Sequence, residues 1–349
     1  MKAGILGPIH TASYFGGVAT FDEGLAKGFQ AMKSEVFICT EQDDGATGCR
    51  DNAVYSLRDA SFRKIMDYER PDVLIASLDY GKYFFTRWVP SECLKVYYLH
   101  GFFDDAYYPK WKVLTGSLFQ KCVCFASDAV VANSSFTAEV NRHLWSIEAD
   151  AVIYPGVGED YLCKGRRARA YGGGGCVLYA GRLHEAKRVD TIVEAVGLVS
   201  KLMPDVELII AGEGPQEREL RKLAGSFKYP VHFIGRVQRD AIPDLYNKAD
   251  VFVSLNDREP FGITYSEALL CGCKIVCPST GGQIDFLAQY EDRVALCHDL
   301  SAESVASKIV QQLSDNRRLK PIADADRFSY VRVASDFELL RRRLGLGIK

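Results

Sequence analysis

The chain has 349 residues, which exceeds the size that one hydrophobic core usually serves, so we expect two domains of similar size. Its 43 Lys and Arg side chains against 45 Asp and Glu leave a net charge of −2, which argues against nucleic acid as a partner. The eleven cysteines lie in apolar runs such as 271–277, without a paired C-x-x-C motif and a histidine partner. We therefore expect reduced core thiols and no structural zinc.

The N-terminal segment, residues 1–10, contains an apolar run that is too short for a signal peptide and ends in a glycine loop. No stretch approaches the length needed to cross a bilayer. We interpret the segment as the first strand of a cytoplasmic protein.

Short apolar runs bounded by turn residues alternate with amphipathic segments along the chain. This order is typical of parallel sheets with crossover helices, so we predict an α/β fold. The candidate strands of the first half are 2–7, 35–40, 72–77, 94–100, 129–133 and 149–154. Those of the second half are 176–181, 206–212, 231–235, 250–255, 274–278 and 293–297. The sequence therefore predicts two Rossmann-like halves.

Residues 155–175 separate the halves with charge, proline and a four-glycine run at 172–175. No GK[ST] follows the glycines, so the run predicts a mobile linker rather than a phosphate cradle. The chain ends with helical spacing at Val331, Ala334, Phe337, Leu340 and Leu344. We therefore predict a terminal helix.

The most informative motif is EPFGITYSE at 259–267. Glu259 follows a strand and Glu267 lies one turn into the next helix, while Gly262 between them lets backbone N–H groups approach a diphosphate. A second interpretation is a T-x-x-E capping box from Thr264 to Glu267, in which Glu267 only satisfies the helix start. The spacing alone leaves both interpretations open.

Cations and glycines also follow candidate strands. Arg182 and Lys187 lie between a strand and a helix, where Arg could contact a diphosphate with two N–H groups and Lys as a point charge. Solvated surface charges are the alternative. Gly16 and Gly17 follow the first strand and could bring backbone close to a donor phosphate or an acceptor. His100 ends a buried strand, and either faces the ligand edge of the sheet or is structural.

The second half carries four segments in one order: 178–195, 208–215, 231–250 and 259–282. In this order they resemble the retaining GT-B enzymes of glycosyltransferase family four, the glycosyl transferases group 1. The resemblance implies a GT-B fold, with two Rossmann-like doubly wound parallel-sheet domains facing a cleft and a C-terminal helix crossing back to the first domain. The implied domains are an acceptor-binding domain at 1–157, a donor-binding domain at 158–328, and the terminal helix at 329–349.

The resemblance also implies roles for individual residues. The implied catalytic residues are His100, Arg182, Lys187 and Glu259. The implied donor-binding residues are Gly16, Gly17, Val237, Phe261, Gly262, Ile263, Thr264 and Glu267. The cations and the N–H groups of 262–264 would neutralise the diphosphate, and Val237 would contact the base through its backbone. Glu259 would contact the donor sugar, Glu267 the ribose, and His100 the reacting sugar. The sequence departs from the family at Arg188, where a glycine is usual.

The function implied is transfer of a sugar, a hexose by expectation, from a UDP- or GDP-linked donor to a glycan, a lipid-linked acceptor or another hydroxyl. No metal or other cofactor is expected, because the one D-x-D motif of the chain, Asp324 to Asp326, lies in a helical stretch near the C-terminus. A GT-B sugar-nucleotide epimerase and a non-catalytic module that binds nucleotide sugars are the alternatives.

Residues 107–122 mix three lysines with aromatic and aliphatic side chains. Such a mixture suits peripheral contact with the inner membrane face, where a lipid-linked acceptor would lie. The alternative is a solvated helix whose apolar side packs in the core.

Overall fold

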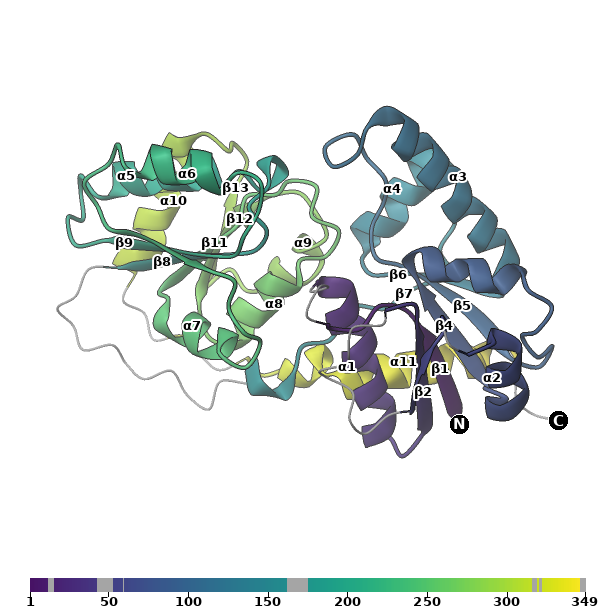
Figure 1. Cartoon of the computed structure of the whole chain (residues 1–349). Coiled ribbons are helices and arrows are strands. Elements are labelled where there is room, and N and C mark those ends of the chain that lie inside the picture. Colours follow the sequence, from purple (N-terminus) through teal and green to yellow (C-terminus); the bar gives the residue numbers. More distant parts are fainter. Residues whose placement is uncertain are drawn as a thin grey trace. The chain divides into compact units, whose positions relative to one another are not determined.

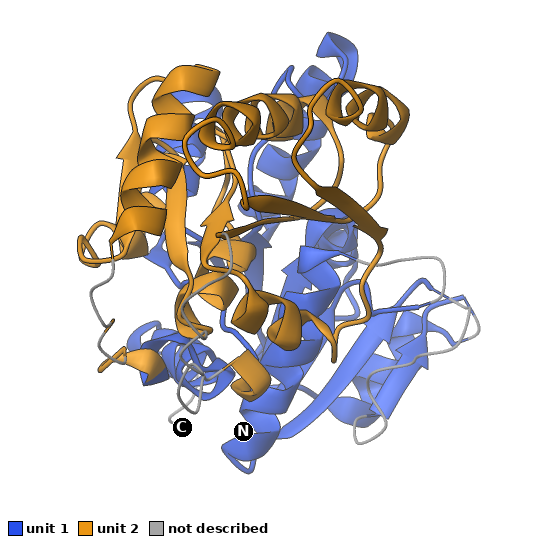
Figure 2. Cartoon of the chain, turned by 90° about the vertical axis from the view of Figure 1, so that its left-hand side faces the viewer, with its two compact units in different colours: residues 1–158, 326–349 blue, residues 159–325 orange. Residues whose placement is uncertain are grey.

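The computed structural model describes residues 1–11, 16–42, 53–58, 60–161, 175–315, 319 and 322–345. The chain divides into two compact units, of which the first comprises residues 1–158 and 326–349 and the second residues 159–325 (Figure 2). The predicted mobile linker falls largely on residues 162–174, which lie outside the described residues.

The first unit is built on a parallel sheet with the strand order β3-β2-β1-β4-β5-β6-β7 (Figure 1). Its strands are β1 (Lys2–Leu6), β2 (Glu35–Thr40), β3 (Ala53–Ser56), β4 (Val73–Ser77), β5 (Leu94–Leu99), β6 (Ala129–Ala132) and β7 (Ala151–Val152). Alternate residues of the central strands enter two separate cores, as the period of two requires. Ile5 thus packs in one core, with α1 (Gly17–Ala31) and α11 (Tyr330–Arg343), and Leu6 in the other, with α2 (Phe62–Glu69).

The remaining helices of the first unit follow β5 and β6. They are α3 (Lys110–Ala126) and α4 (Ser135–Trp145), and a 3-10 helix over Leu78–Phe85 follows β4. Buried Gln120 of α3 donates from Nε2 to Asn141 Oδ1 of α4 over 2.7 Å. The two helices are thus joined through a polar contact inside the unit.

The terminal helix α11 packs on α1, which confirms that the end of the chain returns to the first domain (Figure 1). Glycines on α1 allow the close approach, since a Cβ at Gly28 would lie 2.1 Å from the carbonyl oxygen of Tyr330. The phenol of Tyr330 in turn donates to the carbonyl of Thr20 over 3.0 Å. Of the residues with helical spacing, Val331 and Leu344 are exposed, while Tyr330 and Val333 are buried.

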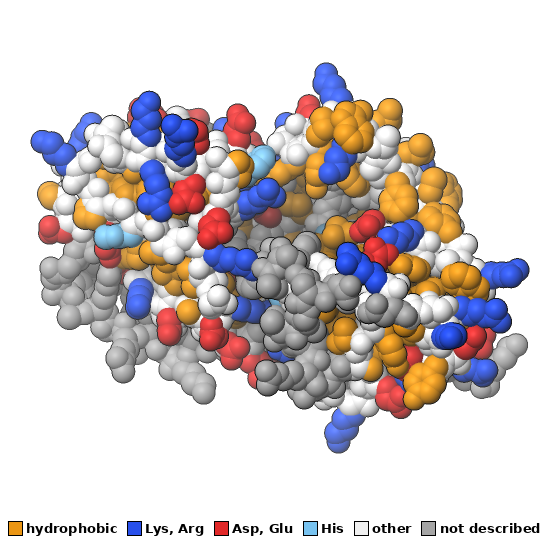
Figure 3. Space-filling view, in the orientation of Figure 1, with side chains coloured by type: hydrophobic (Ala, Val, Ile, Leu, Met, Phe, Trp, Pro, Cys, Tyr) orange, Lys and Arg blue, Asp and Glu red, His pale blue; other side chains and the backbone are white. Residues whose placement is uncertain are grey.

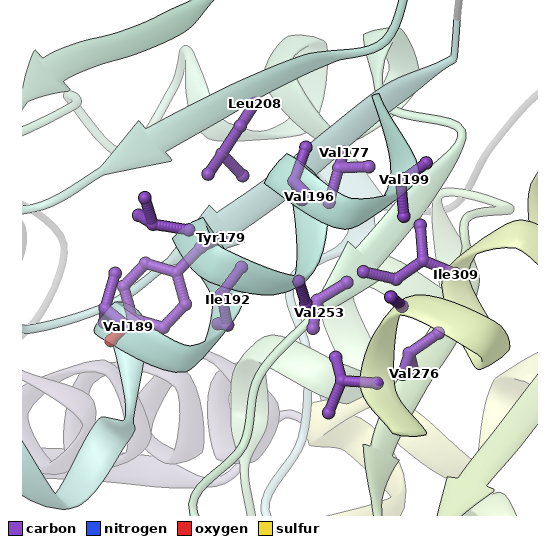
Figure 4. Packing of buried hydrophobic residues seen from close by; sticks show 14 of the residues in the cluster. Val177, Tyr179, Val189, Ile192, Val196, Val199, Leu208, Val253, Val276 and Ile309 are labelled. Atoms are coloured by element: carbon purple, nitrogen blue, oxygen red, sulfur yellow. The ribbon is translucent and has the colours of Figure 1, made fainter. Parts of the chain in front are cut away.

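The second unit holds a parallel sheet with the order β10-β9-β8-β11-β12-β13. Its strands are β8 (Cys176–Ala180), β9 (Glu207–Ala211), β10 (Val231–Gly235), β11 (Val251–Val253), β12 (Lys274–Pro278) and β13 (Val294–Cys297). Its helices are α5 (Val189–Val199), α6 (Glu217–Ala224), α7 (Ile242–Lys248), α8 (Ile263–Leu270), α9 (Ile284–Leu287) and α10 (Ala302–Ser314). Figure 4 shows Ile192 of α5 and Ile309 of α10 packing in the same core as Val177 and Val253 of the sheet.

These sheets confirm the predicted α/β class with two doubly wound halves. In each sheet the strand order reverses once, between β1 and β4 in the first and between β8 and β11 in the second. Ligands of such folds bind beyond the carboxyl ends of the strands at this reversal. The functional residues are therefore to be sought at these two places.

The described cysteines are free, and most are buried. Burial raises the pKa of Cys93 to about 12 and that of Cys297 to about 11. Cys122 on α3 is exposed, so the expectation of a core thiol was wrong at that position.

Candidate functional site

Lys187 and Glu259 meet at the reversal of the second sheet. Strand β8 leads into a 3-10 turn (Glu185–Lys187), and the neighbouring β11 leads into the loop that carries Glu259. Because the strands are neighbours, Lys187 Nζ donates to Glu259 Oε2 over 2.5 Å although the residues are 72 positions apart. The two side chains are only 21% and 16% exposed. The fold thus places one cation and one carboxylate where ligands bind in this class.

Asn256, which the sequence analysis missed, supports the same carboxylate. Its Nδ2 donates to Glu259 Oε2 over 2.9 Å, and its Oδ1 accepts from the N–H of Arg258 over 3.2 Å. Burial acts to raise the pKa of Glu259, but the Lys187 ammonium and the hydrogen bonds from Lys187 and Asn256 outweigh it and hold the pKa below its usual value. Glu259 is therefore an ionised hydrogen-bond acceptor at neutral pH.

Helix α8 begins beside this pair. Gly262 precedes it with φ 83, in the left-handed region that favours glycine, and a Cβ there would lie 3.1 Å from Cγ of Glu259. In the part of the chain that the structure describes, the N–H groups of Gly262, Ile263 and Thr264 donate to no acceptor. These groups and the helix dipole favour an anion at this end of the helix.

Glu267 does not form the capping box. The N-cap residue is Gly262, and Thr264 lies inside the helix. Glu267 is 8% exposed, its Oε2 accepts from the Tyr246 hydroxyl over 3.0 Å, and Tyr161 also hydrogen-bonds to the carboxyl group. Burial raises the pKa of Glu267 to about 7, although the tyrosine hydrogen bonds act to lower it. The capping interpretation is therefore wrong, and Glu267 is a buried carboxyl held by two phenols.

Three other predicted residues occupy different surroundings. Arg182 is exposed, and among the described residues its guanidinium makes no hydrogen bond or ion pair, while its carbonyl accepts from the Tyr179 phenol over 2.8 Å. Val237 is half-buried in the loop after β10, the edge strand. Phe261 is 1% exposed and packs on Phe286 with ring centroids 4.9 Å apart. Phe261 therefore fixes the loop through packing.

Arg188 keeps the turn for which the resembled family uses glycine. Its φ of 50 and ψ of 42 lie in the left-handed region, where a side chain costs about 1 kcal/mol. Its guanidinium lies 3.3 Å from Asp257 Oδ2 in an exposed ion pair. The departure at Arg188 thus changes the residue and leaves the turn in place.

His100 lies at the carboxyl end of β5 in the first unit. Its Nε2 is 2.8 Å from Ser77 Oγ, and Ser77 Oγ is 2.8 Å from Asp22 Oδ1. Phe21 and Tyr98 meet the imidazole edge-on, with ring centroids 5.1 and 4.8 Å away. Burial lowers the pKa of His100 to about 3, so the ring is neutral at physiological pH.

Gly16 and Gly17 open helix α1. Gly16 is the N-cap residue in extended conformation, and Gly17 is exposed. The residues before them, 12–15, lie outside the described residues. The predicted approach of this loop to a ligand therefore stays a prediction.

The described segments supply no metal cluster. Among these residues, no group of three or more His, Cys, Asp or Glu could hold a metal ion. Asp324 of the D-x-D motif precedes a 3-10 turn (Ala325–Phe328) and accepts from the Tyr290 phenol over 2.7 Å. Of the helices described, none is long and apolar enough to cross a membrane.

Comparison with known proteins finds similarity mainly in the second unit. Residues 166–327 match the model of the glycosyl transferases group 1. The second unit resembles a glycosyltransferase. A curated relative, the phosphatidyl-myo-inositol mannosyltransferase of Mycobacterium tuberculosis, is 31% identical over 172 residues, which cover 47% of this chain and 45% of the relative. The chain spans less than half the length of the first curated relatives that it matches.

Solved glycosyltransferase structures match nearly the whole chain. The sucrose-phosphate synthase of Thermosynechococcus elongatus has a TM-score of 0.78 at 18% identity and covers 99% of both chains. The Anabaena protein HepE, in complex with UDP and glucose, has a TM-score of 0.72 at 18% identity and covers 97% of this chain and 99% of its own. At such identities the likeness concerns the fold, and it confirms the predicted GT-B class.

Proposed function

We propose that the protein is a retaining glycosyltransferase that moves a hexose from a UDP- or GDP-linked donor to a hydroxyl of a glycan or lipid-linked acceptor, without a metal or other cofactor. The observation that carries the proposal is the Lys187–Glu259 pair beside the start of α8. The match of residues 166–327 to the glycosyl transferases group 1 supports the same activity.

The second unit would bind the diphosphate. Departure of a diphosphate from the sugar builds negative charge on its oxygens, and fixed positive groups stabilise that charge best. Lys187 supplies a half-buried ammonium, and Arg182 an exposed guanidinium that could make two parallel hydrogen bonds. The N–H groups of Gly262, Ile263 and Thr264 complete a positive surface, so the neutralisation needs no metal ion.

Hydroxyl groups of the donor would meet carboxylates. Ionised Glu259 would accept hydrogen bonds from the sugar, and Glu267 from the ribose, where ribose hydroxyls replace or join those of Tyr246 and Tyr161. The backbone at Val237 would contact the base. In the first unit, His100 would contact the reacting sugar, and Gly16 with Gly17 the donor phosphate or the acceptor.

Retention without a covalent intermediate fits the surroundings of Glu259. Its carboxylate is held by Lys187 and Asn256, so its charge is already compensated. A carboxylate whose charge is compensated in this way accepts hydrogen bonds from hydroxyls well but is a poor nucleophile toward the sugar carbon. We therefore propose that the diphosphate leaves and the acceptor attacks on the same face of the sugar, within an ion pair.

Helix α3 supports a lipid-linked acceptor. Its buried face carries Ser117, Gln120 and Val123, while its large apolar side chains are exposed: Trp111 is 68% exposed, Leu114 63%, Leu118 62% and Phe125 82%. Figure 3 shows hydrophobic side chains gathered along the part of the first unit where Figure 1 places α3. The alternative interpretation, with the apolar side of this segment in the core, was therefore wrong.

The charge of α3 favours an anionic surface. Residues 110–126 contain three lysines, Lys110, Lys112 and Lys121, and no acidic residue. Exposed aromatic and aliphatic side chains beside lysines suit the headgroup region of an anionic leaflet. We propose that this cytoplasmic enzyme contacts the inner membrane face peripherally through α3, from which it would reach a lipid-linked acceptor.

A donor screen tests the transferase proposal. Thermal shifts with UDP- and GDP-sugars would identify a donor, and transfer to glycan and lipid acceptors would then be measured. Lys187→Ala and Glu259→Ala should abolish transfer, while Lys248→Ala, which removes an exposed lysine on α7, should leave it unchanged. An isomerised donor in the absence of acceptor would indicate an epimerase instead, and binding without turnover a binding module.

Vesicle flotation tests the membrane contact. We expect the protein to float with vesicles that contain anionic lipid and to remain below with neutral vesicles. Trp111→Ser together with Phe125→Ser should abolish flotation. The control pair Leu144→Ser and Leu202→Ser changes side chains that are similarly exposed elsewhere, and should float normally. Equal flotation of both pairs would contradict the proposal.

A further inference from the structure

Asp22, Ser77 and His100 form a continuous hydrogen-bonded chain that the proposed transfer reaction does not explain. Two contacts of 2.8 Å join Asp22 Oδ1 to Ser77 Oγ and Ser77 Oγ to Nε2 of His100. Asp22 and Ser77 are fully buried. These hydrogen bonds run from Asp22 on α1, through Ser77 at the end of β4, to His100 at the end of β5. They therefore join elements on both sides of the reversal in the first sheet.

The surroundings of Asp22 favour its neutral form. Its Oδ2 is buried and has no hydrogen-bond partner among the residues that the structure describes, and it lies so close to Gly7 that a Cβ there would be 2.0 Å away. A carboxylate with one bare, buried oxygen is costly. Burial raises the pKa of Asp22 well above its ordinary value, although the Ser77 hydrogen bond acts to lower it. Other titratable groups near it, Glu23 and Tyr98, supply no positive charge.

A neutral Asp22 that carries its proton on Oδ1, the oxygen with a partner, sets the direction of both hydrogen bonds. The carboxyl proton is then donated to Ser77 Oγ, so the single proton of Ser77 is donated to Nε2 of His100. The proton of the neutral imidazole must then reside on Nδ1. An ionised Asp22 would reverse both bonds and place the proton on Nε2.

We propose that Asp22 and Ser77 are positioning residues that hold His100 in its Nδ1–H form, so that the ring presents a hydrogen-bond donor to an oxygen of the transferred sugar. Among the described residues, Nδ1 makes no hydrogen bond, and it is not one of the buried atoms that lack a partner. The Asn133 side chain donates to the His100 carbonyl over 2.8 Å and holds the backbone in place. The role of the donor rests on the proposed function, whereas the tautomer does not.

Nitrogen-15 NMR of the histidine rings in the ligand-free, full-length protein tests the tautomer directly. The His100 signals are assigned as those lost in His100→Gln. We expect a protonated Nδ1 and an unprotonated Nε2 at neutral pH. Ser77→Ala should lose this preference, because nothing then donates to Nε2. Asp22→Asn should retain it, because the amide can donate to Ser77 as the carboxylic acid does.

The pH dependence separates Asp22 from its neighbours. Asp22 is neutral below its raised pKa and ionised above it, so the wild-type tautomer should move toward Nε2–H as the pH rises through that pKa. Asp22→Asn removes that change. Ionisation of Glu23, which pairs with His10, or of Tyr98 would leave the change in place in Asp22→Asn, and that result would overturn the assignment to Asp22.

Kinetics then connect the tautomer with catalysis. With an active donor, Ser77→Ala should lower kcat about tenfold. The affinity for UDP or GDP alone should stay unchanged, because neither Ser77 nor His100 contacts the nucleotide in the proposed complex. If Ser77→Ala unfolds the protein, the wild-type and Asp22→Asn spectra still decide the tautomer.

The outcomes are separable. A protonated Nε2 in the wild type, or an unchanged spectrum in folded Ser77→Ala, would overturn the inference. An Nδ1–H form with the expected Ser77→Ala loss, in a protein that binds no nucleotide sugar, would uphold the hydrogen-bonded chain and refute the proposed function instead.

Discussion

The two sheets carry sites of opposite electrostatic character at equivalent places. At the reversal of the second sheet, Lys187 and ionised Glu259 form a partly exposed ion pair. At the reversal of the first sheet, buried Asp22 and Ser77 are hydrogen-bonded to a neutral His100, and burial raises the pKa of Asp22. One sheet topology can therefore hold either a charged pair or a series of hydrogen bonds with a set donor direction, depending on which side chains follow the strands. A diphosphate needs the first, and an uncharged sugar the second.

Removing the cation should have the largest effect. Lys187→Ala deletes the charge that would meet the diphosphate and leaves Glu259 half-buried without its partner. We expect kcat/KM for the donor to fall by roughly 10² to 10³, as for the loss of one preorganised donor to a developing charge. Steady-state kinetics measure it, with Lys248→Ala as the control. A fall of less than about fivefold, on the order of 1 kcal/mol, would separate Lys187 from the diphosphate.

The buried carboxyl of the second unit should make stability depend on pH. The pKa of Glu267 is about 7 in the folded protein, against roughly 4.3 when unfolded. Because the folded pKa is the higher one, burial of Glu267 does not lower the free energy of unfolding below the unfolded pKa. Above that pKa the free energy of unfolding falls increasingly as pH rises to about 7. Glu267→Gln should remove this loss, which is on the order of 3 kcal/mol.

Calorimetry between pH 4 and pH 8 measures the effect on Glu267. The matched control is Glu194→Gln, which changes an exposed glutamate on α5 and should keep the wild-type pH profile. A parallel loss of stability in wild type and Glu267→Gln as pH rises would show that Glu267 is not the cause.

Only the first unit depends on the end of the chain for its packing. Gly28→Ala would place a Cβ only 2.1 Å from the Tyr330 carbonyl oxygen and should therefore move α11 away from α1. We expect a loss of about 1 to 3 kcal/mol, seen as a lower unfolding temperature for that unit in calorimetry. Gly225→Ala in the second unit meets nothing closer than 3.5 Å and should be neutral. Similar losses in both variants would show that the approach of α11 is not the cause.

The smallest effect is expected at Arg188. Arg188→Gly relieves the left-handed backbone but adds freedom to the unfolded chain, so we expect a gain of about 0.5 kcal/mol. Asp257→Asn removes only the exposed ion pair and should change stability by less than that. Chemical denaturation compares the two. A destabilised Arg188→Gly would mean that the side chain contributes more than the backbone costs.

Much of the fold could be predicted, because its strands are apolar runs that alternate with amphipathic helices. All predicted strands appear as β1, β2 and β4 to β13. Strand β3 was missed because it has only four residues, none of them fully buried, at the sheet edge. On α11 the spacing identified the helix but did not show which side chains are buried, since Tyr330 is buried against glycines of α1 that no local pattern reveals.

The candidate site could be predicted where a motif carries it and not where the fold assembles it. Asn256 and Ser77 each follow or end an apolar strand, so a search for polar residues at strand ends would have found both. Asp22 gave no such signal, because a carboxylate within a helix is ordinarily exposed. Its contact with Ser77 depends on how α1 packs against the sheet. The interpretation of Glu267 as a capping residue failed for the same reason, since Tyr246 and Tyr161 come from other segments.

Nucleotide binding measured by calorimetric titration tests whether the diphosphate is bound by Lys187 of the second unit and not by His100 of the first. Wild type, Lys187→Ala and His100→Ala would each be titrated with UDP and with GDP. We expect Lys187→Ala to lose affinity for the nucleotide that the wild type binds, and His100→Ala to keep this affinity while losing transfer. Loss of nucleotide affinity in His100→Ala together with normal affinity in Lys187→Ala would contradict the division of charge and proton direction between the two sheets.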